Sequence, residues 1–354
     1  MMDCILCQVG VPATKPVESG IRKLVIQIPC WNEAEALSTT LEALPRQVPG
    51  FTSVEWLVVD DGSTDATVDV ARRCGVHHIV RHPTNRGLAV AFMSGLEHAL
   101  SVGADVIVNT DADNQYEARD IPKLTAPINE GKADFVVGAR PIAETEHFSA
   151  MKKRLQKLGS WAVRIASKTD VADAPSGFRA MSREVAMRLN VFGGYTYTLE
   201  TIIQAGLTDM RVTSVAVRTN EDLRPSRLVR SIPNYVKRSV GTIFRVFLIY
   251  RPLTLFVWAG LLAIGLGMAT GARFLYYFMT GDTGHTQSVV LAALSLILGA
   301  LLLVVAMIAE LISVNRKLSE QILFRIKRLE QRSLAEASRE ALPQPSEVGE
   351  RSQP

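Results

Sequence analysis

Cysteine is scarce in this chain of 354 residues, which has only Cys4, Cys7, Cys30 and Cys74. Their spacing does not indicate a disulfide framework, and no second pair accompanies Cys4 and Cys7 to complete a tetrahedral zinc site. The first twenty residues lack a basic start followed by an apolar run. We therefore expect no secretory signal peptide, a flexible tail over residues 1–20 and a soluble part that stays in the cytoplasm.

Two common nucleotide-binding signatures are also missing. No G-x-G-x-x-G follows the first apolar segment, and no G-x-x-x-x-G-K-[ST] occurs anywhere in the chain. These absences disfavour a dinucleotide-binding fold and a P-loop, so any bound phosphate needs another kind of clamp. The net charge is only +4, and we expect no nucleic-acid partner.

Charge is absent from two long apolar runs, residues 253–272 and 289–309. About twenty helical residues cross the hydrocarbon core of a bilayer, so both runs predict membrane spans, at 252–279 and 287–314. The short loop between them has no lysine or arginine, whereas basic residues flank both outer ends. The positive-inside rule then predicts a multi-pass protein of the cytoplasmic (inner) membrane, with its soluble domain and both termini in the cytoplasm.

The segments that flank the spans are basic. Residues 224–251 carry apolar residues at helical spacing with interleaved arginines and lysines, and Pro233 interrupts the pattern. This predicts amphipathic helices in the membrane interface, the alternative being an ordinary helix packed on the soluble domain. We expect a basic cytoplasmic helix over 315–333 and a disordered tail over 334–354.

Residues 21–223 alternate strand-like and helix-like segments. The expected strands are KLVIQI, EWLVVDDGS, HHIV, ADVIVNTDAD and ADFVVGAR. The expected helices are EALSTTLEAL, TDATVDVARR, RGLAVAFMSGLEHAL and DIPKLTAPI. This alternation predicts an α/β domain with a mostly parallel sheet and helices on both faces.

Polar residues follow the expected strands at the points where they end. They are Asn32 and Glu33, Asp60 and Asp61, Asp111 and Asp113, and Arg140. Ligands of such sheets bind outside the carboxyl ends of the strands, so these side chains predict one site.

The segment NTDADNQY, residues 109–116, is the candidate metal site. In an extended loop Asp111 and Asp113 point the same way, and Gln115 continues that face. Magnesium and manganese take oxygen ligands and bridge carboxylates to substrate phosphates. A polar loop without a metal is the alternative for the D-x-D pattern alone, but the VVDDGS segment at the second strand favours metal and nucleotide.

Six motifs, in order, resemble those of the glycosyltransferase family 2 enzymes of the GT-A fold. They include IPCWNEAEAL, VVDDGSTDAT, NRGLAVAFMSGL, NTDADNQY, VVGAR and DAPSGFRAMSREV, and with RPSRLVRSIPNYVKRS the likeness covers residues 21–240. The chain looks most like the polyprenyl-phosphate sugar transferases, which include dolichyl-phosphate mannose synthases. The two-span hairpin is similar to that of the bacterial undecaprenyl-phosphate glucosyltransferase subgroup.

The resemblance implies roles for the matching residues. A nucleotide sugar would be bound by Pro29, Trp31, Asn32, Glu33, Val59, Asp60, Asp61, Asp111, Ala112 and Asp113. Asp111, Asp113 and Gln115 would hold Mg²⁺ or Mn²⁺ and the diphosphate, and Arg140 and Arg227 would lie near the phosphates. Two positions depart from the family: Trp31 stands where tyrosine is frequent, and Leu158 follows Arg154 where serine is frequent. The second departure weakens the assignment of Arg154.

The chemistry of the acceptor explains the arginines. A lipid monophosphate is largely dianionic at neutral pH and needs no general base, but two anionic substrates need cations to hold them together. The catalytic candidates are Asp113, Arg140, Arg154, Arg179 and Arg227. Arg224 and Arg227 border the predicted interface helix, where a lipid headgroup would lie. For any one arginine the alternative is a solvated surface charge.

The sequence thus predicts transfer of a hexose from a nucleotide sugar to polyprenyl phosphate, with inversion implied by the resemblance. UDP-glucose is the first expectation for the donor and GDP-mannose the second, and a homo-oligomer is possible. One alternative is a family 2 transferase with a hydroxyl acceptor on a lipid or polysaccharide. In that case Glu200 is a candidate general base, although the Q-x-x-R-W of processive synthases is absent. A non-catalytic membrane scaffold is the other alternative.

Overall fold

The computed structural model describes most of the soluble domain and both apolar helices. The described residues are 22–141, 164, 167, 169–191, 197–208, 210–220, 248, 252–281, 284 and 286–340. The predictions for the N-terminal tail, for Arg154, Arg224 and Arg227, and for nearly all of the interface segment 224–251 fall outside these residues.

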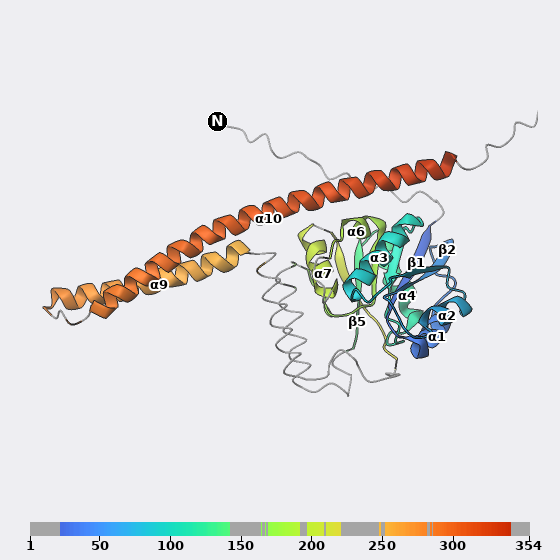
Figure 1. Cartoon of the computed structure of the whole chain (residues 1–354), viewed down its shortest axis with the longest axis horizontal. Helices are drawn as coiled ribbons and strands as arrows, with labels where there is room; N and C mark the ends of the chain where they lie inside the picture. The colour runs from blue at the N-terminus through green and yellow to red at the C-terminus, as the bar shows by residue number, and fades with distance from the viewer. Residues whose placement is uncertain are drawn as a thin grey trace, which may run out of the picture.

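A seven-stranded sheet in the order β3-β2-β1-β4-β6-β5-β7 forms the centre of the domain (Figure 1). The strands are β1 (Lys23–Cys30), β2 (Ser53–Asp60), β3 (His78–Arg81), β4 (Val106–Asn109), β5 (Phe135–Ala139), β6 (Arg179–Ser182) and β7 (Val212–Ala216). All neighbouring pairs are parallel except those of β6, which runs antiparallel to both β4 and β5. The five strands expected from the sequence are confirmed.

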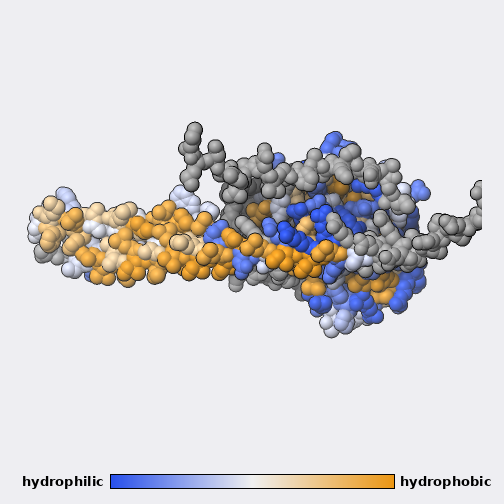
Figure 2. All heavy atoms as spheres, turned by 90° about the horizontal axis from the view of Figure 1, so that it is seen from above, coloured by the Kyte–Doolittle hydropathy of each residue, from blue (hydrophilic) through white to orange (hydrophobic). Residues whose placement is uncertain are grey.

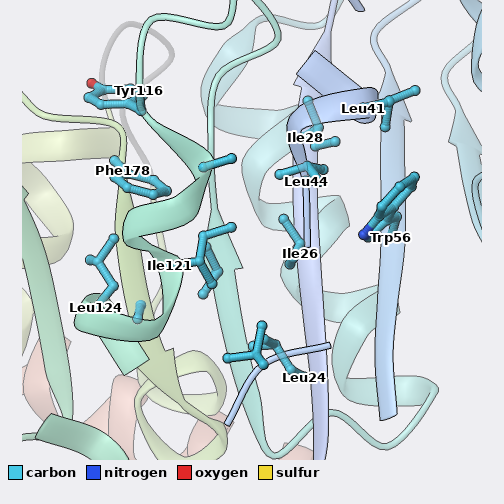
Figure 3. Packing of buried hydrophobic residues seen from close by; sticks show 14 of the residues in the cluster. Leu24, Ile26, Ile28, Leu41, Leu44, Trp56, Tyr116, Ile121, Leu124 and Phe178 are labelled. Carbon is cyan, nitrogen blue, oxygen red and sulfur yellow. The ribbon is translucent and has the colours of Figure 1, made fainter. Parts of the chain in front are cut away.

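Helices cover both faces of this sheet, as expected. On one face lie α1 (Ala34–Ala43), α2 (Thr67–Arg73) and α4 (Ile121–Asn129), and on the other lie α3 (Leu88–Ser101), α6 (Arg183–Arg188) and α7 (Tyr197–Leu207). Strand alternation divides β1 between the two cores: Leu24, Ile26 and Ile28 face α1 and α4, as Figure 3 shows, whereas Val25 faces α3. Burial of these side chains is the main force that fixes the register of the sheet.

The antiparallel strand β6 positions the site. Because β6 is reversed, its first residues lie at the edge of the sheet where β4 and β5 end. The segment 173–178, which leads into β6, therefore lies between the end of β4 and the end of β5. Figure 3 shows Phe178 and Tyr116 close together at this edge, and their rings stack with centroids 5.0 Å apart.

Two helices among the described residues are long and apolar enough to cross a membrane: α9 (Pro252–Met279) and the first part of α10 (Thr286–Glu340). They form a hairpin that projects from the domain (Figure 1). The hairpin is closely packed at glycines, since a Cβ at Gly260 would lie 3.1 Å from the carbonyl oxygen of Gly299. Small residues at such contacts allow membrane helices to approach closely.

The second apolar helix continues far beyond the expected span. The sequence predicted a span, a separate basic helix over 315–333 and a disordered tail from residue 334. In the structure, α10 is instead one continuous helix that ends at Glu340. The expectation of disorder is therefore wrong for residues 334–340. The later part of α10 packs on α3 and α6: Lys327 Nζ donates to Asn190 Oδ1 at 3.2 Å, and the Arg188 guanidinium lies 4.5 Å from the Phe324 ring centroid.

Candidate active site

Asp111 and Gly177 lie in close contact at the edge where β4 ends. A Cβ on Gly177 would lie 2.7 Å and 2.8 Å from the two carboxylate oxygens of Asp111, closer than real Cβ contacts. Glycine at position 177 is therefore what allows the segment before β6 to pass beside the Asp111 carboxylate. No positive φ is involved at Gly177, so the requirement is for space alone.

Buried hydrogen bonds hold this contact in place. Asn109, the last residue of β4, donates from Nδ2 to the Gly177 carbonyl at 2.8 Å and to the Tyr197 hydroxyl at 3.0 Å. The amide of Gly177 donates to the Tyr116 hydroxyl at 2.9 Å. Burial, with the charge of Asp111 adding to it, raises the pKa of Tyr116 to about 12, so this hydroxyl stays protonated. Both polar groups of Gly177 are thus fixed to residues on either side of Asp111.

Arg140 enters the site from the end of β5 and is held by Asp173. Its Nε lies 2.7 Å and its Nη2 lies 3.1 Å from the two carboxylate oxygens of Asp173, which form a bidentate pair. Nη1 points to Gln115 Oε1 at 3.5 Å. A bidentate carboxylate fixes the plane of the guanidinium. Arg140 thus lies beside the Asp111–Gln115 segment, as the sequence predicts.

Asp111 and Asp113 form a donor set that fits a divalent cation. Asp111 is partly exposed, and no described residue donates a hydrogen bond to its carboxylate, whereas Asp113 Oδ1 accepts only from the Gln115 amide at 3.2 Å. Burial and the neighbouring Asp113 raise the pKa of Asp111 to about 7. The described residues offer no cluster of three metal-ligating acidic, His or Cys side chains. The set therefore suits an ion such as Mg²⁺ or Mn²⁺ that completes its shell with phosphate and water oxygens.

Asp60 and Asp61, at the end of β2, both contact protein donors, although Asp60 Oδ2 makes only an ion pair with Arg81 and no hydrogen bond with the described residues. The Asp61 carboxylate accepts from His82 Nδ1 at 2.8 Å and from the amides of Arg86 and Gly87 at 2.9 and 2.7 Å. Asp60 is fully buried, accepts from the Ser63 amide at 3.1 Å and pairs with Arg81 at 3.2 Å. Contact of this pair with the nucleoside stays a prediction, and for Asp61 it would have to coexist with three bonds that hold the loop before α3.

The segment after β1 forms an exposed rim at the same edge. Trp31 is 47% exposed, and Asn32 adopts φ 53°, a left-handed conformation that asparagine tolerates better than most residues. Asn32 is fixed by Ser63 and Thr64, and the Glu33 amide donates to Thr67 Oγ1 at 2.9 Å. Pro29, Val59 and Ala112 are buried beneath this rim. The rim residues predicted for the nucleoside therefore converge near Asp60.

Arg179 corrects the expectation of a phosphate contact. Its side chain is fully buried and donates to the carbonyls of Ser176, Ala174 and Thr198 and to Thr201 Oγ1. Burial lowers its pKa to about 10, so it remains charged at neutral pH but inside the core. It joins the segment before β6 to α7. Glu200 lies in the first turn of α7, where an acidic residue is favourable for the helix, and its catalytic role stays untested.

Sequence reasoning missed Asp173 and Gly177 as site residues. Both belong to the motif DAPSGFRAM, which the sequence analysis used for the resemblance without giving either residue a role. The available signal was an acidic residue and a glycine just before the strand that carries Arg179.

Comparison with known proteins decides the family. The family model described as "Glycosyl transferase family 2" matches residues 25–189, which contain all the site residues described above except those of α7. An uncharacterized glycosyltransferase of Mycobacterium bovis is 32% identical over 198 residues, which are 55% of this chain and 84% of that protein. The chain belongs to glycosyl transferase family 2. Asp111, Asp113 and Arg140 thus lie in the part of the chain that matches the family.

Two further proteins are similar to this family 2 chain. An undecaprenyl-phosphate mannosyltransferase of Micrococcus luteus is 28% identical over 200 residues, which are 54% of this chain and 80% of that protein. The crystal structure of glucosyl-3-phosphoglycerate synthase of Mycobacterium tuberculosis with Mn²⁺, UDP-glucose and phosphoglyceric acid has a TM-score of 0.50 at 20% identity, over 63% of this chain and 79% of that one. The structural likeness supports the GT-A fold.

Proposed function

We propose that this family 2 glycosyltransferase moves a hexose from a nucleotide-diphosphate sugar to polyprenyl phosphate at the cytoplasmic leaflet of the inner membrane. The observation that carries the proposal is the placement of Arg140, oriented by Asp173, beside the two carboxylates Asp111 and Asp113. A cation site for one anionic substrate next to an arginine for another is what transfer to a phosphate requires. The two apolar helices attach this site to a membrane, where a polyprenyl acceptor resides.

In the proposed reaction the residues of this chain orient the two substrates and offset their negative charge. Asp111 and Asp113 would hold Mg²⁺ or Mn²⁺, whose role is to offset the charge that develops on the leaving nucleoside diphosphate. Arg140 would bind phosphate through its outer N–H groups while Asp173 keeps the guanidinium plane fixed. The acceptor phosphate attacks as a dianion, so no side chain has to remove a proton. Inversion at the sugar carbon is part of the proposal.

There are two candidate donors, UDP-glucose and GDP-mannose, which differ in both sugar and base. The sequence resemblance favours UDP-glucose, whereas the name of the Micrococcus luteus relative supports a mannosyl donor such as GDP-mannose. A hydroxyl acceptor with Glu200 as base is the competing reaction, and Glu200→Gln separates the two. This variant is expected to retain transfer to polyprenyl phosphate, and loss of turnover with donor binding intact would favour the hydroxyl acceptor.

One experiment tests the proposal directly. Membranes that contain the full chain are incubated with polyprenyl phosphate and a panel of labelled nucleotide sugars, with and without EDTA. We expect a labelled lipid from one donor, formed only when divalent cation is present, and no product from membranes with Asp113→Ala. Label that appears only in polysaccharide or in a neutral lipid would reject polyprenyl phosphate as the acceptor.

A further inference from the structure

The part of α10 beyond the predicted span has two opposite faces, of which one is partly buried and the other is exposed. One face, formed by Arg316, Glu320, Phe324 and Lys327, is partly buried, and its residues Phe324 and Lys327 contact the catalytic domain. The opposite face is exposed, with Leu318 at 54%, Ile322 at 60% and Leu329 at 63%. Figure 2, which looks down on this opposite face, shows the apolar surface of the hairpin continuing along α10 over the domain.

The exposed face follows a heptad pattern. We define the seam as the residues that recur at alternating steps of four and three: Leu311, Asn315, Leu318, Ile322, Arg325 and Leu329. In the usual heptad notation Asn315, Ile322 and Leu329 occupy a positions, and Leu311, Leu318 and Arg325 occupy d positions. An Ile at a with Leu at d favours two-stranded parallel coils, and a single Asn at a fixes their register.

From this seam we infer that α10 pairs with α10 of a second copy of this chain in a parallel coiled coil. Two copies inserted in one membrane have the same orientation, so their α10 helices run parallel, as the seam requires. The seam begins in the last turns of the predicted span and continues into the soluble part, so the pairing extends across the membrane boundary. The docked face is left unchanged, because it lies on the other side of the helix.

Lipid is a poor alternative occupant of the seam. Arg316 and Glu320 form an ion pair at 2.8 Å just after the predicted span, which marks the polar side of the boundary. Residue 329 lies about 22 Å further along the helix than residue 314, the end of the predicted span. The catalytic domain occupies the other face of the same stretch. A helix segment fixed to a soluble domain at this distance does not lie in the hydrocarbon.

The apolar area is sufficient for a stable pair. Leu311, Leu318, Ile322 and Leu329 are joined at the flanks by the exposed residues Ile312 and Ile326. At about 100 Å² for each side chain, burying these residues on both copies covers roughly 1,200 Å² of apolar surface, of which roughly 800 Å² lies beyond the predicted span and is removed from water. A specific interface needs roughly 1,000 Å². Arg325 is the one charged seam residue, and its long side chain can extend along the flank with the guanidinium in water.

Disulfide cross-linking of the full chain in its membrane tests the pairing. In a background with Cys4, Cys7 and Cys74 changed to serine and the buried Cys30 retained, Leu318→Cys and Leu329→Cys are expected to give a product of twice the chain mass on mild oxidation. Glu330→Cys is the matched control, because residue 330 is exposed but lies about 100° around the helix from residue 329. Equal cross-linking at 329 and 330, or none at 318 and 329, would overturn the inference.

Mass measurement in lipid nanodiscs gives an independent test. The unmodified chain is expected to be a dimer, Ile322→Lys with Leu329→Lys a monomer, and Arg325→Leu a dimer that persists at lower protein concentration. Unchanged circular dichroism and thermal unfolding of the lysine variant confirm that α10 remains folded and docked through Phe324. A monomeric unmodified chain, or a lysine variant that stays dimeric, would contradict pairing through this seam.

Discussion

The two acidic pairs at the edge of the sheet have the same kind of side chain but opposite surroundings. Asp61 is bound by His82 and two backbone amides, and Asp60 is buried beside Arg81. Asp111, by contrast, has no described hydrogen-bond donor on its carboxylate and a pKa raised by burial and by Asp113. A carboxylate that accepts several hydrogen bonds from the protein maintains a loop, whereas one that accepts none from the described residues is available for a cation. Substitutions in the Asp111 and Asp113 pair should therefore reduce transfer, whereas substitutions in the Asp60 and Asp61 pair should reduce stability.

The largest effect is expected from Asp113→Ala. Removing one of two carboxylates weakens the cation site and should reduce transfer about a thousandfold, because the cation offsets several kcal/mol of charge in the transition state. The melting temperature should change little, since Asp113 accepts only one amide hydrogen bond. Transfer rates are measured across a range of Mg²⁺ and Mn²⁺ concentrations. Retained activity at saturating metal would refute the metal assignment.

Arg140→Ala is expected to reduce transfer by about a hundredfold, the loss of one well-placed charged hydrogen-bonding group. The exposed Arg72, which pairs with Asp69 on the surface, is the control, and Arg72→Ala should leave transfer unchanged. Because Arg140→Ala removes the ion pair that the buried Asp173 makes with Arg140, unfolding is measured in parallel, and Arg140→Ala with Asp173→Asn removes the Asp173 charge as well. Comparable transfer rates for the Arg140 and Arg72 variants would contradict the phosphate role.

Gly177→Ala tests whether the position of Asp111 matters. The added Cβ would overlap the Asp111 carboxylate, and a displacement of about 1 Å can cost up to a hundredfold in rate, so we expect a loss of ten- to a hundredfold. Gly265→Ala is the matched control, since a Cβ there meets nothing within 4 Å. The readouts are transfer rate and the metal concentration for half-maximal activity. An unchanged metal dependence would show that Asp111 does not need this approach.

Asp61→Ala should act on stability. It removes three hydrogen bonds and leaves the buried His82 and two amides without their acceptor, which costs about 2–3 kcal/mol. We expect a lower melting temperature with unchanged metal dependence in the protein that remains folded, the reverse of Asp113→Ala. A variant with normal stability and lost donor binding would instead place Asp61 in the nucleotide site.

The smallest effect concerns Asp120, a third carboxylate satisfied by the protein. Burial alone would raise its pKa, but hydrogen bonds from Arg218 and Lys123 lower the pKa to about 2. An unfolded aspartate titrates near pH 3.9, so this contribution is complete above that pH and is lost as the pH falls towards 2. Melting temperatures at pH 3 and pH 7 should differ less for Asp120→Asn than for the unmodified chain. An equal difference would assign the acid sensitivity to other groups.

Local patterns were enough to predict the first five strands, the four helices between them and the edge at which Asp111 and Arg140 meet. The strand β6 was not anticipated, because RAMS is too short for a visible alternation and begins with an arginine. That arginine is buried through bonds to backbone carbonyls, which depend on the tertiary fold. The pairing of Arg140 with Asp173 likewise joins residues 33 positions apart. The end of α10 was misplaced because SLAEASRE is charged, yet it consists largely of good helix formers.

Because α10 is one continuous helix, its length fixes the distance between the predicted span and the catalytic domain. The helix leaves the predicted span near residue 314 and docks on the domain at Phe324, a distance of about 15 Å along its axis. A single helix cannot shorten over that length without losing hydrogen bonds, so the distance of the catalytic domain from the hairpin is set by the number of residues between them. In the proposed reaction, an acceptor that diffuses in the plane of the membrane would meet the sugar donor at one fixed level.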